Sequence, residues 1–461
     1  MTETQFINLR LLLRKHGESN YQAQLEHDSQ PYPQPVTFNF ALTDKISGNN
    51  DFSYYFQRLG ELKAREEDLD IVGKALYNLV FREDLGSKFE AWYQALTEGE
   101  RFRLRLDIQA PELISIPWEL LRDDKQFLVR RGVSIVRFIG NAPKKYVNLD
   151  FQNMKVLIVS ASPKNNSFIE NEYIEPVKTL FKGYGIQPDI LTGENATRLG
   201  LQRILDENKY DLFHFVGHGT FAKDNGKVIV INQQGNSESI RGNDLSDWLW
   251  NSEVKFAFFC SCQTGITSQE NTFNGVAHSL VGRGIPAVVA MQYNFPQEEA
   301  KTFVESFYNK LLRSEGIDKS MEFARNALPY EEVSWCIPVL YSQSQFNIRR
   351  LVAQPISEQP ISEEKITKQD MQQLADFLVK SGFCALDQRE GLCISIEIEA
   401  NKLNFFNNPN NSTFALLLVN HLFEMEKTTS LKLLFNELEA AFKEGKNAEI
   451  LRSIKAKLRY Y

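Results

Sequence analysis

Two apolar runs of the sequence end at side chains that could together carry out acyl transfer. Residues 211–217 (DLFHFVG) lead into His218 and Gly219, and residues 255–260 (KFAFFC) lead into Ser261 and Cys262. A thiol attacks a carbonyl carbon as its thiolate, and an imidazole can accept the thiol proton and later give it to the leaving amine. The sequence therefore predicts Cys262 as nucleophile and His218 as general base and acid.

Both runs are typical of strands that are buried in a parallel sheet. Each is short, apolar without alternation, and followed by small or polar residues. Ligands of open α/β sheets bind at the carboxyl ends of the strands, so we expect His218 and Cys262 to meet at that edge. The main-chain amides of Gly219 and Cys262 would then hold the oxyanion of a tetrahedral intermediate.

The same residues leave other interpretations open. Cys262 can be a small buried hydrophobic residue and His218 a structural histidine. A zinc site made of His214, His218, Cys260 and Cys262 is a further alternative, although a Cys-x-Cys pair on a buried strand has poor spacing for a chelate. We expect His214 and Cys260, which come earlier on the two strands, to lie in the core, and we predict no metal and no cofactor.

The pattern of strands and helices divides the chain into four parts. Residues 1–150 mix short strands with helices and contain no catalytic constellation, so we expect an α+β scaffold. Residues 151–350 alternate strands with helices, which predicts a mostly parallel sheet covered by helices. Residues 351–367 contain two Gln-Pro-Ile-Ser segments and are predicted to be a linker. Residues 368–461 have apolar residues at spacings of three and four, which predicts a bundle of about five helices.

Composition limits the class of partner. The 461 residues carry a net charge of −7, which argues against nucleic acid and against an anionic membrane as partners. No apolar run approaches the roughly 20 residues of a membrane span, and the first residues lack the order of a signal peptide, which predicts a cytoplasmic protein. Five cysteines scattered over so long a chain predict reduced thiols.

At the predicted dyad the chain resembles the CHAT family of caspase-like cysteine proteases, relatives of caspases and separase. The matching motifs are HFVGHG at 214–219, SCQTG at 261–265, IPAVVAMQ at 285–292 and IPWELLR at 116–122. The positions of His218 and Cys262 differ by 44, close to the roughly 50 residues typical of caspases. The resemblance implies a caspase-like fold and a cysteine endopeptidase that acts on protein substrates, with residues 1–150 as a pseudo-caspase-like scaffold.

The substrate pocket is less defined by the resemblance. Metacaspase-like relatives place an aspartate two residues before the cysteine to receive a basic P1 side chain. Cys260 stands at that position here, so a preference for Arg or Lys is not implied. We predict that Gln263, Gln292 and Tyr293 line the pocket.

Residues 405–422 and 431–434 resemble the effector-associated domains of bacterial conflict systems, which are death-like adaptor bundles. This resemblance implies a homotypic partner for residues 368–461, recruitment or activation in bacterial signalling or defence, and leaves homo-oligomer formation on activation open. One alternative is a catalytically inactive CHAT-type scaffold. Another is a different acyl-transfer enzyme with the same dyad, such as a transpeptidase or an amidase.

Overall fold

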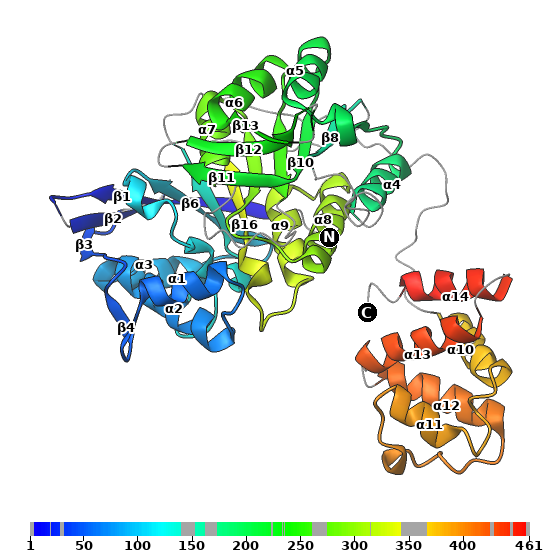
Figure 1. The fold of residues 1–461 in the computed structure, drawn as a ribbon. Helices are drawn as coiled ribbons and strands as arrows, with labels where there is room; N and C mark the ends of the chain where they lie inside the picture. Colours follow the sequence, from blue (N-terminus) through cyan, green and yellow to red (C-terminus); the bar gives the residue numbers. More distant parts are fainter. Residues whose placement is uncertain are drawn as a thin grey trace. The chain divides into compact units, whose positions relative to one another are not determined.

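The chain forms two compact units, Met1–Ile356 and Ser357–Tyr461 (Figure 1). Each unit contains its own cluster of buried apolar side chains. The boundary between the units falls within the predicted linker at 351–367. The computed structural model describes residues 4–18, 20–27, 32–139, 153–161, 173–222, 225–232, 234, 236–260, 274–313, 315–342, 367–424, 428–442 and 446–457.

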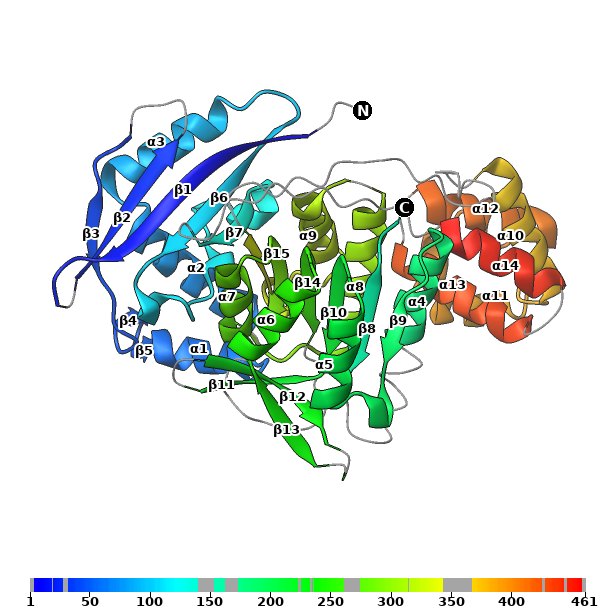
Figure 2. The ribbon, with the colours of Figure 1, turned by 90° about the horizontal axis from the view of Figure 1, so that it is seen from above.

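An eleven-stranded sheet runs through unit 1 in the order β3-β2-β1-β6-β7-β16-β15-β14-β10-β8-β9 (Figure 2). Only the pairs β1·β2, β2·β3 and β15·β16 are antiparallel, so the predicted mostly parallel sheet is confirmed. The strands are β1 (Gln5–Lys15), β2 (Asn20–His27), β3 (Val36–Asn39), β6 (Glu100–Ile108), β7 (Ser134–Phe138), β8 (Val156–Ser160), β9 (Asp189–Leu191), β10 (Leu212–Val216), β14 (Phe256–Cys260), β15 (Ala287–Met291) and β16 (Pro338–Ser342).

The central strands are buried on both faces, which explains their solid apolar sequences. Every residue of β8, β10, β14, β15 and β16 is buried. Because side chains alternate along a strand, Phe256 and Phe258 join the cluster that contains α4, α8 and α9, whereas Ala257 and Phe259 join the one that contains α5, α6 and α7. These helices are α4 (Glu175–Gly183), α5 (Arg198–Glu207), α6 (Gly242–Asn251), α7 (Asn274–Arg283), α8 (Gln297–Leu312) and α9 (Ile317–Asn326).

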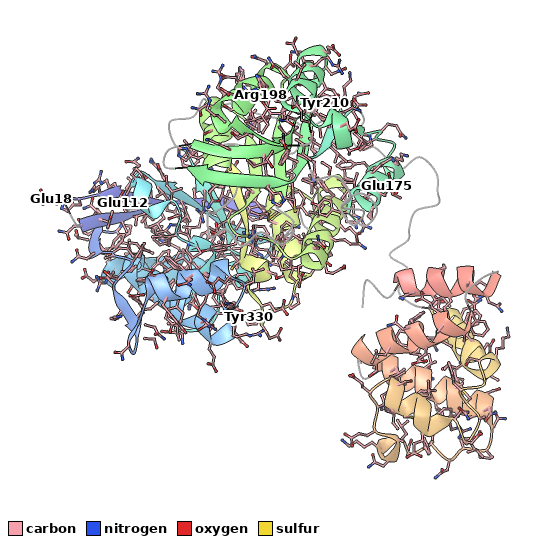
Figure 3. All side chains as sticks on the ribbon, viewed as in Figure 1. Glu18, Glu112, Glu175, Arg198, Tyr210 and Tyr330 are labelled. Carbon is pink, nitrogen blue, oxygen red and sulfur yellow. The ribbon has the colours of Figure 1, made fainter. Side chains whose placement is uncertain are left out.

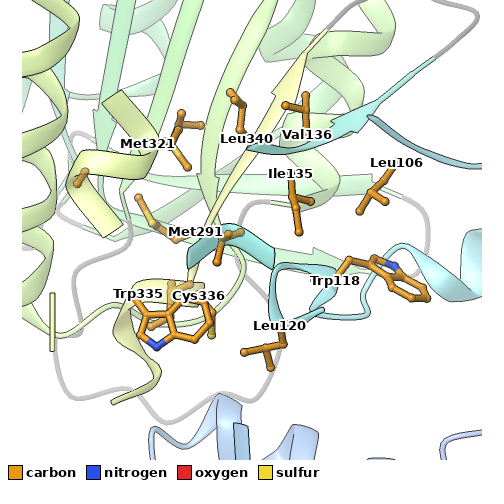
Figure 4. Close-up of a cluster of buried hydrophobic side chains, with 14 of the residues drawn as sticks. Leu106, Trp118, Leu120, Ile135, Val136, Met291, Met321, Trp335, Cys336 and Leu340 are labelled. Atoms are coloured by element: carbon orange, nitrogen blue, oxygen red, sulfur yellow. The ribbon is translucent and has the colours of Figure 1, made fainter. Parts of the chain in front are cut away.

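The predicted boundary at residue 150 falls inside one sheet. β7 from the first half pairs in parallel with β16 from the second half. Apolar side chains of both halves, among them Trp118, Ile135, Met291 and Trp335, pack together at this junction (Figure 4). Residues 1–150 are therefore one side of a continuous sheet rather than a separate compact unit.

Three helices and two small sheets complete unit 1. A three-stranded antiparallel sheet directly follows β10. Charged side chains such as Glu112, Glu175 and Arg198 lie at the periphery of the unit (Figure 3). The remaining elements are α1 (Phe52–Gly60), α2 (Glu66–Val80), α3 (Glu83–Gln94), β4 (Lys45–Ser47), β5 (Asn50–Asp51), β11 (His218–Ala222), β12 (Asn225–Ile231) and β13 (Ser237–Arg241).

Unit 2 is a helical bundle, as its apolar spacing predicts. Thr367 caps the first helix: its hydroxyl oxygen accepts a hydrogen bond from Asp370 N at 3.1 Å, and Asp370 Oδ2 accepts one from Thr367 N at 2.8 Å. The likeness of this bundle to death-like adaptors stays a prediction. Its helices are α10 (Lys368–Lys380), α11 (Arg389–Ser395), α12 (Asn411–Glu424), α13 (Thr428–Ala441) and α14 (Lys446–Lys457).

Within the described part of the chain, every helix is too short or too polar to span a membrane.

Gly73 allows α2 to lie directly on the IPWELLR segment. A Cβ atom at this position would come within 2.8 Å of Arg122 Cβ and 2.9 Å of Phe127 Cε1, and would also clash with the main-chain oxygen of Leu120. Arg122 N donates to Gly73 O at 3.2 Å across the same contact. A side chain at Gly73 would therefore have to push the main chain at Leu120 away from α2.

We therefore predict that Gly73→Ala destabilises unit 1 by about 1–3 kcal/mol, although alanine favours helices, because overpacking costs more than helix propensity gains. Urea unfolding followed by tryptophan fluorescence reports on unit 1 alone, since all five tryptophans lie in it. Gly183→Ala is the matched control, because no atom lies within 4 Å of its added Cβ. Equal stability of Gly73→Ala and Gly183→Ala would contradict the close contact.

Candidate active site

The pairing of β10 with β14 fixes the relative positions of the two strands that precede the predicted catalytic residues. The register runs from Leu212 beside Phe256 to Val216 beside Cys260, with a constant difference of 44 positions. Gly217 N continues the ladder and donates to Cys260 O at 3.1 Å. The last paired residues, Val216 and Cys260, each stand two positions before a predicted catalytic residue. Cys262 and Gln263 themselves lie outside the described residues.

His218 is the first residue of β11, at the carboxyl end of β10. Its side chain is half-buried, and burial lowers its pKa from the ordinary value. A lowered pKa keeps the imidazole neutral at pH 7, which is the form that a general base needs. Gly219 follows it in the same strand and is buried.

His214 lies in the core, as predicted. It is fully buried, and its ring stacks on Phe258 with ring centroids 4.9 Å apart. Its Nδ1 is 2.8 Å from the hydroxyl of Tyr308, and its Nε2 is 3.2 Å from that of Tyr173. Both ring nitrogens are thus occupied by tyrosine hydroxyls, and this argues against His214 as a zinc ligand.

Cys260 also lies in the core. Its side chain has no exposed surface and belongs to the same apolar cluster as Phe258 and Tyr308. A thiol in such a place is shielded from substrate, unlike a residue in a loop beyond the strand. The prediction that Cys260 lies in the core is confirmed, whereas the role of Cys262 stays a prediction.

Gln292, one of the predicted pocket residues, has internal hydrogen-bond partners. It directly follows β15 but is fully buried, and its Nε2 donates to Cys336 O at 2.7 Å and to Glu119 Oε2 at 3.2 Å. Its Oε1 accepts from Arg137 Nη2 at 3.2 Å. Because its amide is committed to these internal partners, the side chain turns away from solvent. Tyr293 is only 5% exposed, so it too offers little surface to a substrate.

A buried ion pair between Glu119 and Arg137 lies beside Gln292. Arg137 Nη2 is 2.8 Å from Glu119 Oε2, and both side chains are almost wholly buried. Arg137 also donates to the main-chain oxygen of Ile116 at 3.0 Å. The pair ties the IPWELLR segment and β7 to the end of β15. Sequence analysis did not assign it, although a glutamate between apolar residues in that segment was a usable signal.

The buried His214 should make stability depend on pH. Desolvation lowers its pKa to about 3, so the folded state keeps it neutral where the unfolded chain, with a pKa near 6.5, becomes protonated. Its contribution is complete above pH 6.5 and is lost as the pH falls toward 3.

We predict that unit 1 loses about 2 kcal/mol between pH 6.5 and pH 5 through this residue, at about 1.4 kcal/mol per pH unit. In the His214→Gln variant, the free energy of unfolding should fall less over this pH range. Urea unfolding followed by tryptophan fluorescence measures it. His16→Gln, at an exposed site, should behave as the wild type does. The prediction fails if His214→Gln and the wild type show the same slope.

The family model described as "CHAT domain" matches residues 70–341, more than half of the chain. Among solved structures, the Saccharomyces cerevisiae separase–securin complex is similar with a TM-score of 0.35 and 13% identity, covering 57% of this chain and 17% of that chain. No protein with a curated description matches. The chain therefore belongs to the CHAT family.

Proposed function

We propose that this protein is a caspase-like cysteine endopeptidase in which Cys262 is the nucleophile and His218 the general base and acid. The observation that supports the proposal is the register of β10 and β14. It places Val216 beside Cys260, and each is followed after two residues by one member of the dyad. Two residues of chain reach at most about 7 Å, so Cys262 is tethered to the edge at which His218 stands.

The proposed reaction uses these two side chains and two main-chain amides. His218 takes the proton of the Cys262 thiol, and the thiolate forms a C–S bond with the carbonyl carbon of the peptide. The amides of Gly219 and Cys262 hold the resulting oxyanion. The imidazolium then protonates the leaving amine as the C–N bond breaks. Water, deprotonated by His218, hydrolyses the acyl-enzyme and restores the thiol.

Unit 2 is proposed to recruit the protease. Its helices enclose a core of their own, and its described residues contain no group of three or more His, Cys, Asp or Glu that could hold a metal ion. A separate bundle joined by a linker is suited to binding another protein while unit 1 acts. We propose a homotypic partner and a bacterial signalling or defence context for this recruitment, with activation by proximity in the cytoplasm.

We predict that Cys262→Ala and His218→Gln each reduce peptide hydrolysis by about a thousandfold or more, because removal of either group disables the acyl transfer. Cys260→Ala is the matched control, and we expect it to retain activity because its thiol is buried. The measurement is cleavage-site profiling of a peptide or proteome library with each variant.

A thiol-directed peptide electrophile separates the protease from an inactive scaffold. The protease should be labelled at Cys262, and the label should depend on His218. Equal labelling of Cys260 and Cys262, or none, would favour the scaffold. If the acyl group is transferred to an added amine instead of water, product analysis will identify a transpeptidase.

Proximity activation gives a further prediction. Residues 1–356 contain the whole sheet and its covering helices, so they can be fused to a drug-inducible dimeriser. We expect hydrolysis to rise at least about tenfold when the dimeriser is added, because linking converts association into an intramolecular event. The same fusion with Cys262→Ala is the control. Full activity without the dimeriser would contradict activation by proximity.

A further inference from the structure

The strand that contains His218 lies at the edge of its sheet. β11 is the outer strand of the three-stranded antiparallel sheet, whose order is β11-β12-β13 (Figure 1). In the described part of the chain, β11 pairs with β12 and with no second strand. An exposed strand edge is a template for another extended chain, so proteins usually cover or shorten it. An edge that begins at the proposed general base is therefore suited to bind a peptide in extended form.

The register of β11 and β12 shows which main-chain groups face this edge. Ala222 pairs with Asn225, and only two residues separate them. Residues that flank so short a connection exchange hydrogen bonds with each other, and bonded and non-bonded pairs then alternate along the ladder. Every second residue before Ala222 therefore bonds to β12. The N–H and C=O groups of Gly219 and Phe221 point instead to the outer edge.

This orientation extends the proposed oxyanion site along the strand. The mechanism above assigns the Gly219 amide to the oxyanion, so the scissile carbonyl lies at the outer edge of β11. The next main-chain groups on that edge belong to Phe221, about 7 Å away. In an antiparallel pairing, Phe221 O accepts from the N–H of the P3 residue. In a parallel pairing, it accepts from that of the P4′ residue.

Two basic side chains lie on the same face of this sheet as His218. Lys227 of β12 is level with Thr220 of β11 and pairs with Arg241 of β13. The neighbouring Val228 is buried in the core. Because side chains alternate along a strand, those of His218, Lys227 and Arg241 point to the opposite, outer face.

Lys227 is the unbalanced charge of this pair. Like charges directly opposite each other on neighbouring strands are destabilising. Arg241 is compensated by Asp244, which accepts from its Nε at 3.1 Å and from its Nη2 at 2.9 Å. Among the described residues, no carboxylate forms an ion pair with Lys227. An acidic side chain of a peptide bound to β11 would supply the missing negative charge.

We propose that the substrate lies along β11 as an added strand, with its scissile bond beside His218 and Gly219, and that Lys227 selects an acidic side chain. The proposal rests on the protease function proposed above and specifies its substrate. In either direction of the peptide, the second residue from the scissile bond, P2 or P2′, is level with Thr220. Its side chain then lies on the outer face, about 10 Å from the main chain of Lys227. A lysine and a glutamate side chain together span that distance.

Peptides with single N-methyl groups test the added strand. The probe is a short peptide around one site of the cleavage-site profile, methylated at one main-chain amide at a time. Methylation at P3 or at P4′ should lower kcat/KM about fivefold or more, because it removes the hydrogen bond to Phe221 O. Sensitivity at P3 indicates an antiparallel strand, and sensitivity at P4′ a parallel one. Hydrolysis that tolerates both methyl groups would overturn the added strand.

A substitution in β11 assigns the effect to this edge. Phe221→Pro removes an N–H that points outward, which an edge strand tolerates. The sensitive methyl group should have a smaller effect in this variant, because the pairing is already disrupted there. Phe221→Ala keeps the N–H and is the matched control. An unchanged methyl effect in a folded Phe221→Pro protein would place the peptide on another strand and overturn the proposal.

Charge reversal tests the selection of an acidic residue. Two peptides with Glu or Lys at P2, and two with Glu or Lys at P2′, are compared. The wild type should cleave one Glu peptide about fivefold faster than its Lys counterpart, and Lys227→Glu should reverse this preference. Lys88→Glu, at an exposed site on α3, is the control and should keep the wild-type preference.

The outcomes separate the two proposals. Hydrolysis with the same charge preference in the wild type and in Lys227→Glu would overturn the selection by Lys227 and leave the protease function intact. Absence of hydrolysis of every peptide by the wild type would overturn the protease function itself.

Discussion

The parallel pairing of β10 with β14 is the constraint on which the rest of unit 1 depends. Five residues of each strand are paired, and all ten are buried. A pair buried on both faces cannot slip by one residue without turning its side chains toward the opposite cluster. This register places Val216, two residues before His218, beside Cys260. The helices on both faces thus hold the register as well as the core.

Polar groups inside this core appear where strands and segments from different parts of the chain must be joined. His214 bridges Tyr173 and Tyr308 on one face of the sheet, and Glu119 pairs with Arg137 beside Gln292. A buried ion pair adds little net stability over apolar packing, but loss of one partner leaves an uncompensated charge. Such groups therefore favour one arrangement of the halves over its alternatives. The Glu119–Arg137 pair acts at the junction of the two halves of the sheet.

Much of the fold could be predicted from the spacing of apolar residues in the sequence. The joining of the two halves of the sheet through β7 and β16 could not. The central strands are buried on both faces and read as solid apolar runs, whereas β6 alternates between buried and partly exposed residues. The regular alternation of strands and helices from Met154 onward predicts a boundary near residue 150, because local spacing does not encode that β7 pairs with β16.

Site residues were predictable where main-chain topology positions them. The order of residues after a buried strand was enough to place His218 at the carboxyl end of β10, and the position of Cys262, which lies outside the described residues, stays a prediction. Gln292 follows β15 at that edge as well, and the same reasoning predicted a pocket residue. Its amide instead turns inward, because Glu119 and Arg137 require a polar partner in the core. A strand end gives the position of a Cα atom, but the direction of the side chain depends on partners that are distant in sequence.

The two roles that we propose, acyl transfer by unit 1 and recruitment by unit 2, require different physical properties. This favours placing them in separate units. Acyl transfer needs groups held by a rigid support, and a sheet buried on both faces supplies one. Activation by proximity instead needs a weak interface between copies, so that the copies stay dissociated when the protein is dilute. Tethering raises effective concentration to the millimolar range for short linkers, so an interface of low affinity becomes occupied once a scaffold gathers several copies. A large apolar interface would keep copies associated at all concentrations, and the proposed protease would then lack an inactive state.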